Sequence, residues 1–252
     1  MGDDVVDDKV FRVSASVRGA WVSPALTIKP PCLLDVLQMA ADRVVEDLHL
    51  TMTDMLKLGV SWMVHRYDVE LARPLMDKAP ITVETWHKAV DDLFTVREFC
   101  LLDGEGKTVG TAVSSWILVD VARRRPVRLS RHVPEQFITY SSRPARLIRG
   151  HLPPLSRIDS EEPVHVRLCD LDMNGHVNNT SYAAWMTEGV PDDVFASCGL
   201  VGMTIEFLHE VTRQSRPVCR SGRDGLEFCH ELTDESGRVF CRGRTKWQKL
   251  LC

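Results

Sequence analysis

The same order of predicted secondary structure occurs twice along this chain of 252 residues. In the first half, alternating apolar and polar residues over Phe11–Arg18 predict a strand. Apolar residues at spacings of three and four from Leu33 to Leu48 predict a helix, and Pro31 suits its first turn. A period of two then predicts four strands, at Val60–Leu71, Ile81–His87, Phe94–Leu102 and Thr108–Asp120.

The second half repeats this order. Alternation of Val164, Val166 and Leu168 predicts a strand, and the pattern from Asn179 to Glu188 predicts a helix. Four more strands are predicted at Val201–Leu208, Val218–Arg223, Leu226–Leu232 and Val239–Gln248. An internal duplication explains this order. We therefore expect an α+β fold, in which two antiparallel sheets each wrap around a central helix and join into one continuous sheet.

This duplication divides the chain into three parts. We expect an N-terminal half at residues 1–125, a connector containing arginine and proline at 126–155, and a C-terminal half at 156–252. The connector lies between two halves of one sheet, so it is expected to cross the outer face of that sheet.

Composition excludes several classes of protein. The formal net charge of −4 argues against a dedicated nucleic-acid binder, which would carry a basic surface. The eight cysteines include no C-x-x-C pair, which argues against a zinc ribbon or a disulfide framework. No apolar stretch approaches the roughly 18 residues of a membrane span. We expect a soluble, cytoplasmic protein that binds neither nucleic acid nor membrane.

One segment concentrates polar side chains between a predicted strand and a predicted helix. Asp170, Asp172, Asn174 and His176 lie within seven residues, and such polarity is costly to bury unless it is used. A calcium site of the EF-hand type is one alternative. It would require a glutamate where this chain has Ser181 and a helix where the pattern before the loop predicts a strand. A transition-metal site is a second alternative, but the spacing of its candidate ligands is not distinctive. Those ligands would be His165, Cys169, Asp172 and His176.

Helix capping is the third alternative, because Asn178 or Asn179 can cap the helix that follows. Capping does not account for Asn174 and His176 together. Because neither metal alternative fits the sequence well, no metal or cofactor is expected.

The run Asp172-Met-Asn174-Gly-His176-Val-Asn178-Asn179, followed by Tyr182 and Trp185, resembles the signature of the acyl-acyl carrier protein (acyl-ACP) thioesterases of plant plastids and bacteria. Further matches extend the resemblance over nearly the whole chain: Trp62–Arg66, Thr85-Trp86, Arg97, Ser115-Trp116, Asp120 and Ile205–Glu210. The resemblance implies a double hotdog fold. It also implies hydrolysis of an acyl thioester on acyl carrier protein to a free fatty acid, as part of fatty acid biosynthesis.

The resemblance places the active site at Asp172, Asn174, His176 and Glu210. Val211 follows Glu210 where the family often has cysteine, so a thiolate nucleophile is excluded at that position. Cys169 is a second candidate thiol, which the strand pattern predicts to be buried packing. In the first half, Pro74 matches Glu210, and the helix entry at residues 30–33 lacks an Asn-x-His sequence. One working site is expected.

These residue types suit hydrolysis by water. Glu210 is the candidate base, Asn174 would hold the water, and His176 would orient or polarise the reacting groups. Asp172 would fix an imidazole or an amide, and N–H groups at the start of the following helix would face the oxyanion. The sequence leaves open which of Asp172, His176 and Glu210 is the base. The acyl tunnel is expected in the first half, and the candidate substrate-binding residues are Met39, Arg43, Trp62, Val64 and Asn178.

A group of arginines begins the connector region. Arg123, Arg124, Arg125 and Arg128 are candidates for docking an acidic acyl carrier protein, while the alternative is a solvated connector. Three other functions remain open: a hotdog acyl-CoA thioesterase, a non-catalytic acyl-binding module and a hotdog dehydratase. Assembly into a homodimer is also left open.

Overall fold

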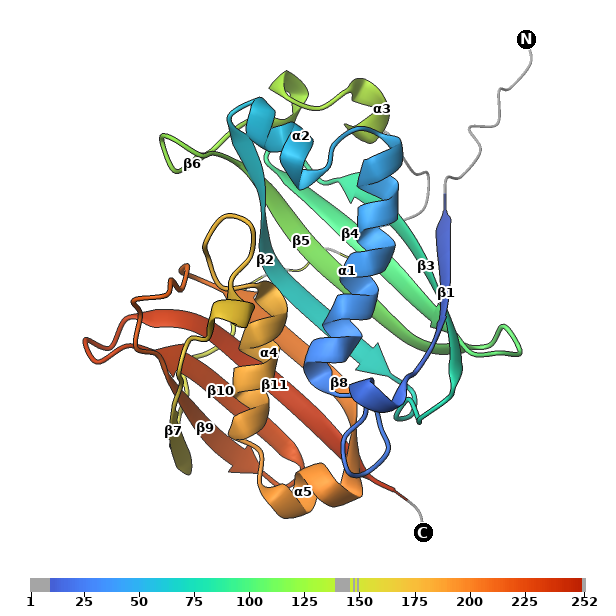
Figure 1. The fold of residues 1–252 in the computed structure, drawn as a ribbon, viewed down its shortest axis with the longest axis vertical. Helices are drawn as coiled ribbons and strands as arrows, with labels where there is room; N and C mark the ends of the chain where they lie inside the picture. The colour runs from blue at the N-terminus through green and yellow to red at the C-terminus, as the bar shows by residue number, and fades with distance from the viewer. Residues whose placement is uncertain (1–9, 139–145, 147, 149, 251–252) are drawn as a thin grey trace.

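The computed structural model describes residues 10–138, 146, 148 and 150–250. Its strands form one antiparallel sheet (Figure 1). In spatial order the strands are β1 (Phe11–Ser16), β3 (Pro80–Ala89), β4 (Phe94–Leu102), β5 (Thr108–Asp120), β2 (Val60–Leu71), β8 (Cys198–Phe207), β11 (Val239–Lys249), β10 (Glu227–Thr233), β9 (Val218–Asp224) and β7 (Ser160–Pro163). The two-residue strand β6 (Arg125–Pro126) pairs with β5.

The two halves of the sheet have the same internal order. The order β1-β3-β4-β5-β2 in the first half corresponds to β7-β9-β10-β11-β8 in the second. Strands β2 and β8 join the halves, in a register that runs from Arg66 opposite Glu206 to Glu70 opposite Gly202. The expected duplication, joined into one continuous sheet, is therefore confirmed.

Two helices, α1 (Pro30–Asp47) and α4 (Asn179–Glu188), lie over the same face of the sheet, one on each half (Figure 1). Helix α1 begins with a proline in its first turn and buries Leu33, Leu37 and Ala40 along one face. Helix α4 begins at the cap residue Asn178, whose side chain accepts a hydrogen bond from the N–H of Thr180. The main hydrophobic core lies between these helices and the sheet.

Short helical segments complete the fold. Helices α2 (Met52–Lys57) and α3 (Glu135–Ile138) cover one end of the first half, and α5 (Asp192–Ser197) precedes β8. Three-residue 3-10 turns occur at Gly19–Trp21, Leu129–Arg131 and Leu168–Asp170. Among the described residues, none of the helices has both the length and the apolar character needed to cross a bilayer.

The strand predicted at 164–168 is wrong. The paired strand is β7, at Ser160–Pro163, and the chain then enters the 3-10 turn at Leu168–Asp170. Asp170 closes this turn because its carboxylate accepts hydrogen bonds from the backbone N–H and the guanidinium of Arg167. Leu168 is 75% exposed and Cys169 is exposed as well, so the expectation that Cys169 is buried in a strand is also wrong.

The described residues of the connector include three that contact the face of the sheet opposite the two helices. Three sheet carboxylates accept hydrogen bonds from backbone N–H groups of the connector. The pairs are Glu98 with Arg146, Glu206 with Leu152, and Glu231 with Leu155. Their neighbours along the strands, Phe99, Ile205 and Leu232, are buried in the main core, so the carboxylates project from the other face.

Candidate active site

The polar segment predicted to carry the chemistry forms a tight loop that leads into α4. The Asp172 carboxylate Oδ1 accepts hydrogen bonds from the backbone N–H groups of Asn174 (2.8 Å) and His176 (3.1 Å). The N–H of Asp172 donates in turn to the carbonyl of His176, at 2.7 Å. Gly175 has a φ of +75°, a conformation that glycine adopts without the steric cost of a Cβ. Asp172 therefore organises the loop backbone that presents Asn174 and His176.

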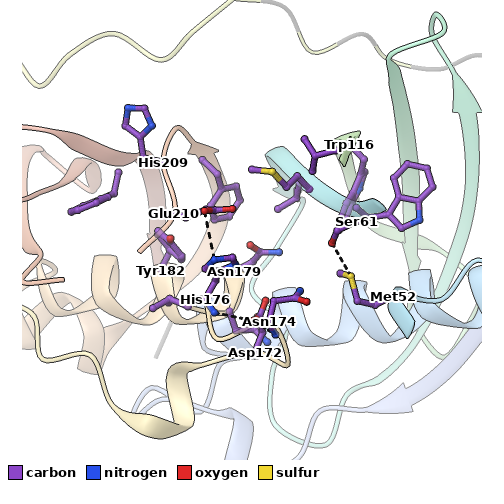
Figure 2. A pocket seen from close by; sticks show the side chains of 18 of the residues that line it. Met52, Ser61, Trp116, Asp172, Asn174, His176, Asn179, Tyr182, His209 and Glu210 are labelled. Carbon is purple, nitrogen blue, oxygen red and sulfur yellow. Dashed lines mark hydrogen bonds and ion pairs between the residues drawn. The ribbon is translucent and has the colours of Figure 1, made fainter. Parts of the chain in front are cut away.

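His176 and Glu210 point toward one another at the cavity (Figure 2). The Nε2 of His176 lies 3.6 Å from Oε2 of Glu210, and their side chains are 34% and 27% exposed. Backbone pairing sets this approach, since His176 forms a bridge with Thr212 and the N–H of Val177 donates to the carbonyl of Val211. The structure thus brings together side chains that are 34 positions apart in the sequence.

Tyr182 supports the segment that carries Glu210. Its hydroxyl oxygen accepts a hydrogen bond from the buried N–H of Val211, at 3.1 Å. Burial raises the pKa of Tyr182, and the nearby Cys241, Glu210 and Asp172 raise it further, so the phenol stays neutral. Tyr182 was part of the sequence motif but was not predicted as a site residue. Tyr182 thus lines the cavity from α4 and supports the segment behind Glu210.

Asn174 and Asn178 both line the cavity, from different positions. Asn174 lies in the loop, beside Asp172 (Figure 2). Asn178 is the cap of α4, with its side-chain oxygen bonded to the N–H of Thr180 at 3.1 Å and its own N–H bonded to the carbonyl of Asp170 at 2.7 Å. The capping interpretation therefore holds for Asn178, while Asn174 remains available to a ligand in the cavity.

The cavity has a volume of about 1240 Å³ and extends from this loop into the first half of the protein. Its first-half wall includes Trp62 and Val64 on β2, as predicted, together with residues of α1. The α1 residues that line it are Gln38, Ala41, Asp42 and Val45. Phe137 and Trp116 also line the cavity. A cavity of this volume can hold an apolar chain whose reactive end lies at His176 and Glu210.

Two of the predicted lining residues lie elsewhere. Met39 is 41% exposed, and Arg43 forms a surface ion pair with Glu46 at 3.2 Å; neither lines the cavity. The expectation that they do is wrong. The helical repeat explains the error, because positions 38, 41, 42 and 45 share one face of α1, and positions 39 and 43 lie on the neighbouring face toward solvent.

The first-half wall also contains polar groups that were not predicted. His87 is buried, and its Nε2 is 2.6 Å from the carbonyl oxygen of Phe137. Burial, reinforced by Arg97, lowers the pKa of His87 to about 3, which leaves the ring neutral. Burial raises the pKa of Asp42 on α1, and Arg97 opposes this rise. The cavity is thus not uniformly apolar.

One of the four predicted docking arginines reaches Glu210. The Arg124 guanidinium donates a hydrogen bond to Oε2 of Glu210 and lines the cavity. Its backbone has a φ of +52°, in the turn that follows β5. Arg123 lies 3.8 Å from Asp120, Arg128 lies 3.5 Å from Asp92, and Arg125 is exposed on β6. Sequence alone could not place Arg124, because its partner is 86 positions away.

The first half contains a second copy of the loop that carries Asp172, Asn174 and His176. Residues 22–28 repeat the backbone of 171–177: a bridge joins Val22 to Ile28 as another joins Leu171 to Val177. The N–H of Ser23 donates to the carbonyl of Thr27 at 2.9 Å, as Asp172 donates to His176. Ser23, Ala25 and Thr27 therefore stand where the working loop has Asp172, Asn174 and His176.

Pro74 completes this copy at the position that corresponds to Glu210. Thr27 bridges to Met76 as His176 bridges to Thr212, which aligns the two segments. A Cβ built on Gly199 would lie 2.4 Å from Pro74, so backbone and side chains fill the space. The first-half counterpart of the segment from Asn174 to His176 is therefore residues 25–27, and the match with the helix entry at 30–33 was wrong. Residues 25–27 also lack an Asn-x-His sequence, which agrees with the expectation of a single such site.

An antiparallel sheet wrapped around two helices, with one polar loop at the start of the second, defines a tandem hotdog protein. The 12:0-ACP thioesterase from Umbellularia californica has this fold, with a TM-score of 0.82 at 24% identity over 96% of this chain and 98% of that one. An oleoyl thioesterase (putative) from Lactobacillus plantarum matches with a TM-score of 0.83 at 19% identity, over 98% of both chains. These likenesses confirm the predicted fold.

The chain belongs to the acyl-ACP thioesterase family, as the sequence motif predicted. The family's N-terminal domain matches residues 8–137 and its C-terminal domain matches residues 156–249. The oleoyl-acyl carrier protein thioesterase 2 of Arabidopsis thaliana is 26% identical over 235 residues, which is 79% of this chain and 64% of the relative. An acyl-[acyl-carrier-protein] hydrolase of Cuphea viscosissima is 26% identical over 267 residues, 98% of this chain and 65% of the relative. The chain spans just under two thirds of the length of these relatives.

Proposed function

We propose that this protein hydrolyses the thioester of an acyl group carried on acyl carrier protein and releases a free fatty acid for lipid metabolism. The observation that carries this proposal is the position of His176 and Glu210 at a cavity of about 1240 Å³ that extends into the first half. Membership of the acyl-ACP thioesterase family supports the same conclusion. The wall of the first half would hold the acyl chain, and the loop at the start of α4 would hold the thioester.

In the proposed reaction Glu210 acts as the general base. Its carboxylate takes a proton from a water molecule that Asn174 holds, and the water oxygen attacks the carbonyl carbon. The N–H groups of Asn178, Thr180 and Ser181 are bonded within the protein. The N–H of Asn179 is therefore the group at the start of α4 that stabilises the oxyanion of the tetrahedral intermediate, with the helix dipole adding to its effect. The intermediate expels the thiolate of the carrier, and the proton on Glu210 returns to that sulfur. His176 orients Glu210 from 3.6 Å.

A covalent route through cysteine has little support in this structure. Val211 occupies the position after Glu210, and it is buried with its N–H bonded to Tyr182. Cys169 is exposed on the 3-10 turn before the loop and does not line the cavity. Water is therefore the proposed nucleophile.

Docking of the carrier at the arginines is part of the same proposal. Acyl carrier proteins are acidic, and exposed arginines would raise the rate of encounter in a salt-dependent manner. Arg123, Arg125 and Arg128 are exposed, although two of them already pair with Asp120 and Asp92. Arg124 is assigned a different role, since it contacts Glu210.

The test is release of free thiol from matched substrates. We expect hydrolysis of acyl-ACP with a higher kcat/KM than hydrolysis of the same acyl group on coenzyme A. A higher kcat/KM for the coenzyme A thioester would instead favour an acyl-CoA thioesterase. Tight acyl binding without turnover of either substrate would favour the non-catalytic acyl-binding module.

A further inference from the structure

A second cluster of ionisable side chains lies on the outer face of the sheet, away from the catalytic loop. It consists of His65 on β2, Glu206 on β8 and His151 on the connector. One nitrogen of each histidine and one carboxylate oxygen all lie within 4.8 Å of one another. The cluster is located where the two halves of the sheet join, because Arg66 and Glu206 face each other across the β2–β8 pair.

A β-bulge places His65 in this cluster. In the pairing of β2 with β5, Val64 lies opposite Trp116 and Arg66 lies opposite Ser115, so His65 is the extra residue. Val64 lines the cavity and Tyr67 is buried in the main core, which puts His65 and Arg66 together on the outer face. Bulges are common beside functional sites because they redirect a side chain.

Glu206 is the buried member of the cluster, with its side chain 0% exposed. Its Oε2 accepts a hydrogen bond from the N–H of Leu152, at 2.8 Å. Its Oε1 bonds to Nδ1 of His151 and lies 3.8 Å from Nε2 of His65. A buried carboxylate needs a positive partner, since an unpaired charge is costly away from water.

The two arginines opposite Glu206 in the sheet register are bonded to other groups. Arg66 binds Asp68 at 3.1 Å and the carbonyl of Gly150. Arg242 binds Glu231 at 2.8 Å and the carbonyl of Leu152. Among the residues that the structure describes, the groups presented to Oε1 of Glu206 are therefore the two imidazoles.

We propose that His65, His151 and Glu206 bind a zinc ion that fixes the connector to the junction of the two halves. Two imidazole nitrogens and one carboxylate oxygen are ligands that zinc accepts in tetrahedral sites, at about 2.0–2.2 Å. Small side-chain movements bring the three atoms to that distance, and the side chain of His151, 71% exposed, has the freedom to make them. The fourth position opens on the solvent side of His151 and takes water.

This inference does not depend on the proposed hydrolase activity, and its test measures metal binding alone. The full chain, without a histidine tag and freed of metal by a chelator, is titrated with Zn²⁺ by calorimetry. We expect one ion per chain, with a Kd of roughly 1 µM or below. Co²⁺ in place of Zn²⁺ should give the intense visible absorption of a tetrahedral site.

His151→Gln and His65→Gln should each weaken binding by at least about 100-fold, because each removes a ligand. His165→Gln is the matched control, since His165 is exposed and lies outside the cluster. The His151→Gln chain should fold normally because that side chain is largely exposed. No stoichiometric binding by the wild type, or equal binding by the His151→Gln and His165→Gln proteins, would overturn the proposal and leave the cluster as an ion pair.

Discussion

Replacing Val64 with phenylalanine should shorten the acyl chain that the protein prefers. Val64 is 6% exposed on β2, lines the first-half wall of the cavity, and lies opposite Trp116 in the β2–β5 register. A phenyl ring at this position occupies space in which the far end of an acyl chain would lie. Short chains do not reach that space and should be hydrolysed nearly as before.

The expected size of the effect follows from the methylenes that lose their contacts. Each methylene excluded from the cavity forfeits about 0.8 kcal/mol, or roughly a fourfold loss in kcat/KM. Displacing two methylenes should lower the ratio of long-chain to short-chain kcat/KM by about 15-fold, and displacing four by about 200-fold. Overpacking the wall also costs about 1–3 kcal/mol of stability, so Tm is measured alongside.

The assay is hydrolysis of a series of saturated acyl-ACP substrates by purified protein. Met39→Phe is the matched control, because Met39 belongs to the same half but is exposed on the outer side of α1. Its chain-length profile should equal that of the wild type. If Val64→Phe and Met39→Phe gave the same profile, the cavity in the first half would not be the acyl-chain site.

Two further predictions concern the surroundings of Glu210. Arg124→Gln should lower kcat about tenfold in steady-state assays, because Glu210 loses the guanidinium that holds Oε2. Arg125 is exposed on β6, so Arg125→Gln is the control and should leave kcat unchanged. Equal kcat values in the two variants would contradict this prediction. Tyr182→Phe should lower the free energy of unfolding in urea by about 1–3 kcal/mol, because the buried N–H of Val211 loses its acceptor, and an unchanged unfolding midpoint would count against this role.

Local patterns in the sequence were sufficient for most of the fold. The strands at Val60–Leu71, Phe94–Leu102 and Thr108–Asp120 have the predicted bounds, because a long run of alternation is a strong signal. Helix α4 also has the predicted bounds, since Asn178 caps it and Gly189 follows it. The strand predicted at 164–168 failed because the Asp170 carboxylate closes a turn there, an interaction that alternation does not register.

The residues of the site also divide into those that local sequence identifies and those that only the fold brings together. Asp172, Asn174 and His176 lie in one contiguous loop, so the sequence motif was enough to propose them. The contact of Arg124 with Glu210 and the cluster of His65, His151 and Glu206 arise only when distant segments meet in the sheet. Helical periodicity identified α1, but it did not show which face of that helix borders the cavity.

The most direct test of the proposed reaction is the turnover of acyl-ACP by the Glu210→Gln protein. Glutamine keeps the size of the side chain and cannot take a proton from water, so kcat should fall by about 100-fold or more. Circular dichroism and Tm should stay close to wild type, because the Glu210 side chain is 27% exposed at the cavity. A Glu210→Gln protein that hydrolyses acyl-ACP at nearly the wild-type rate would contradict the assignment of Glu210 as the base.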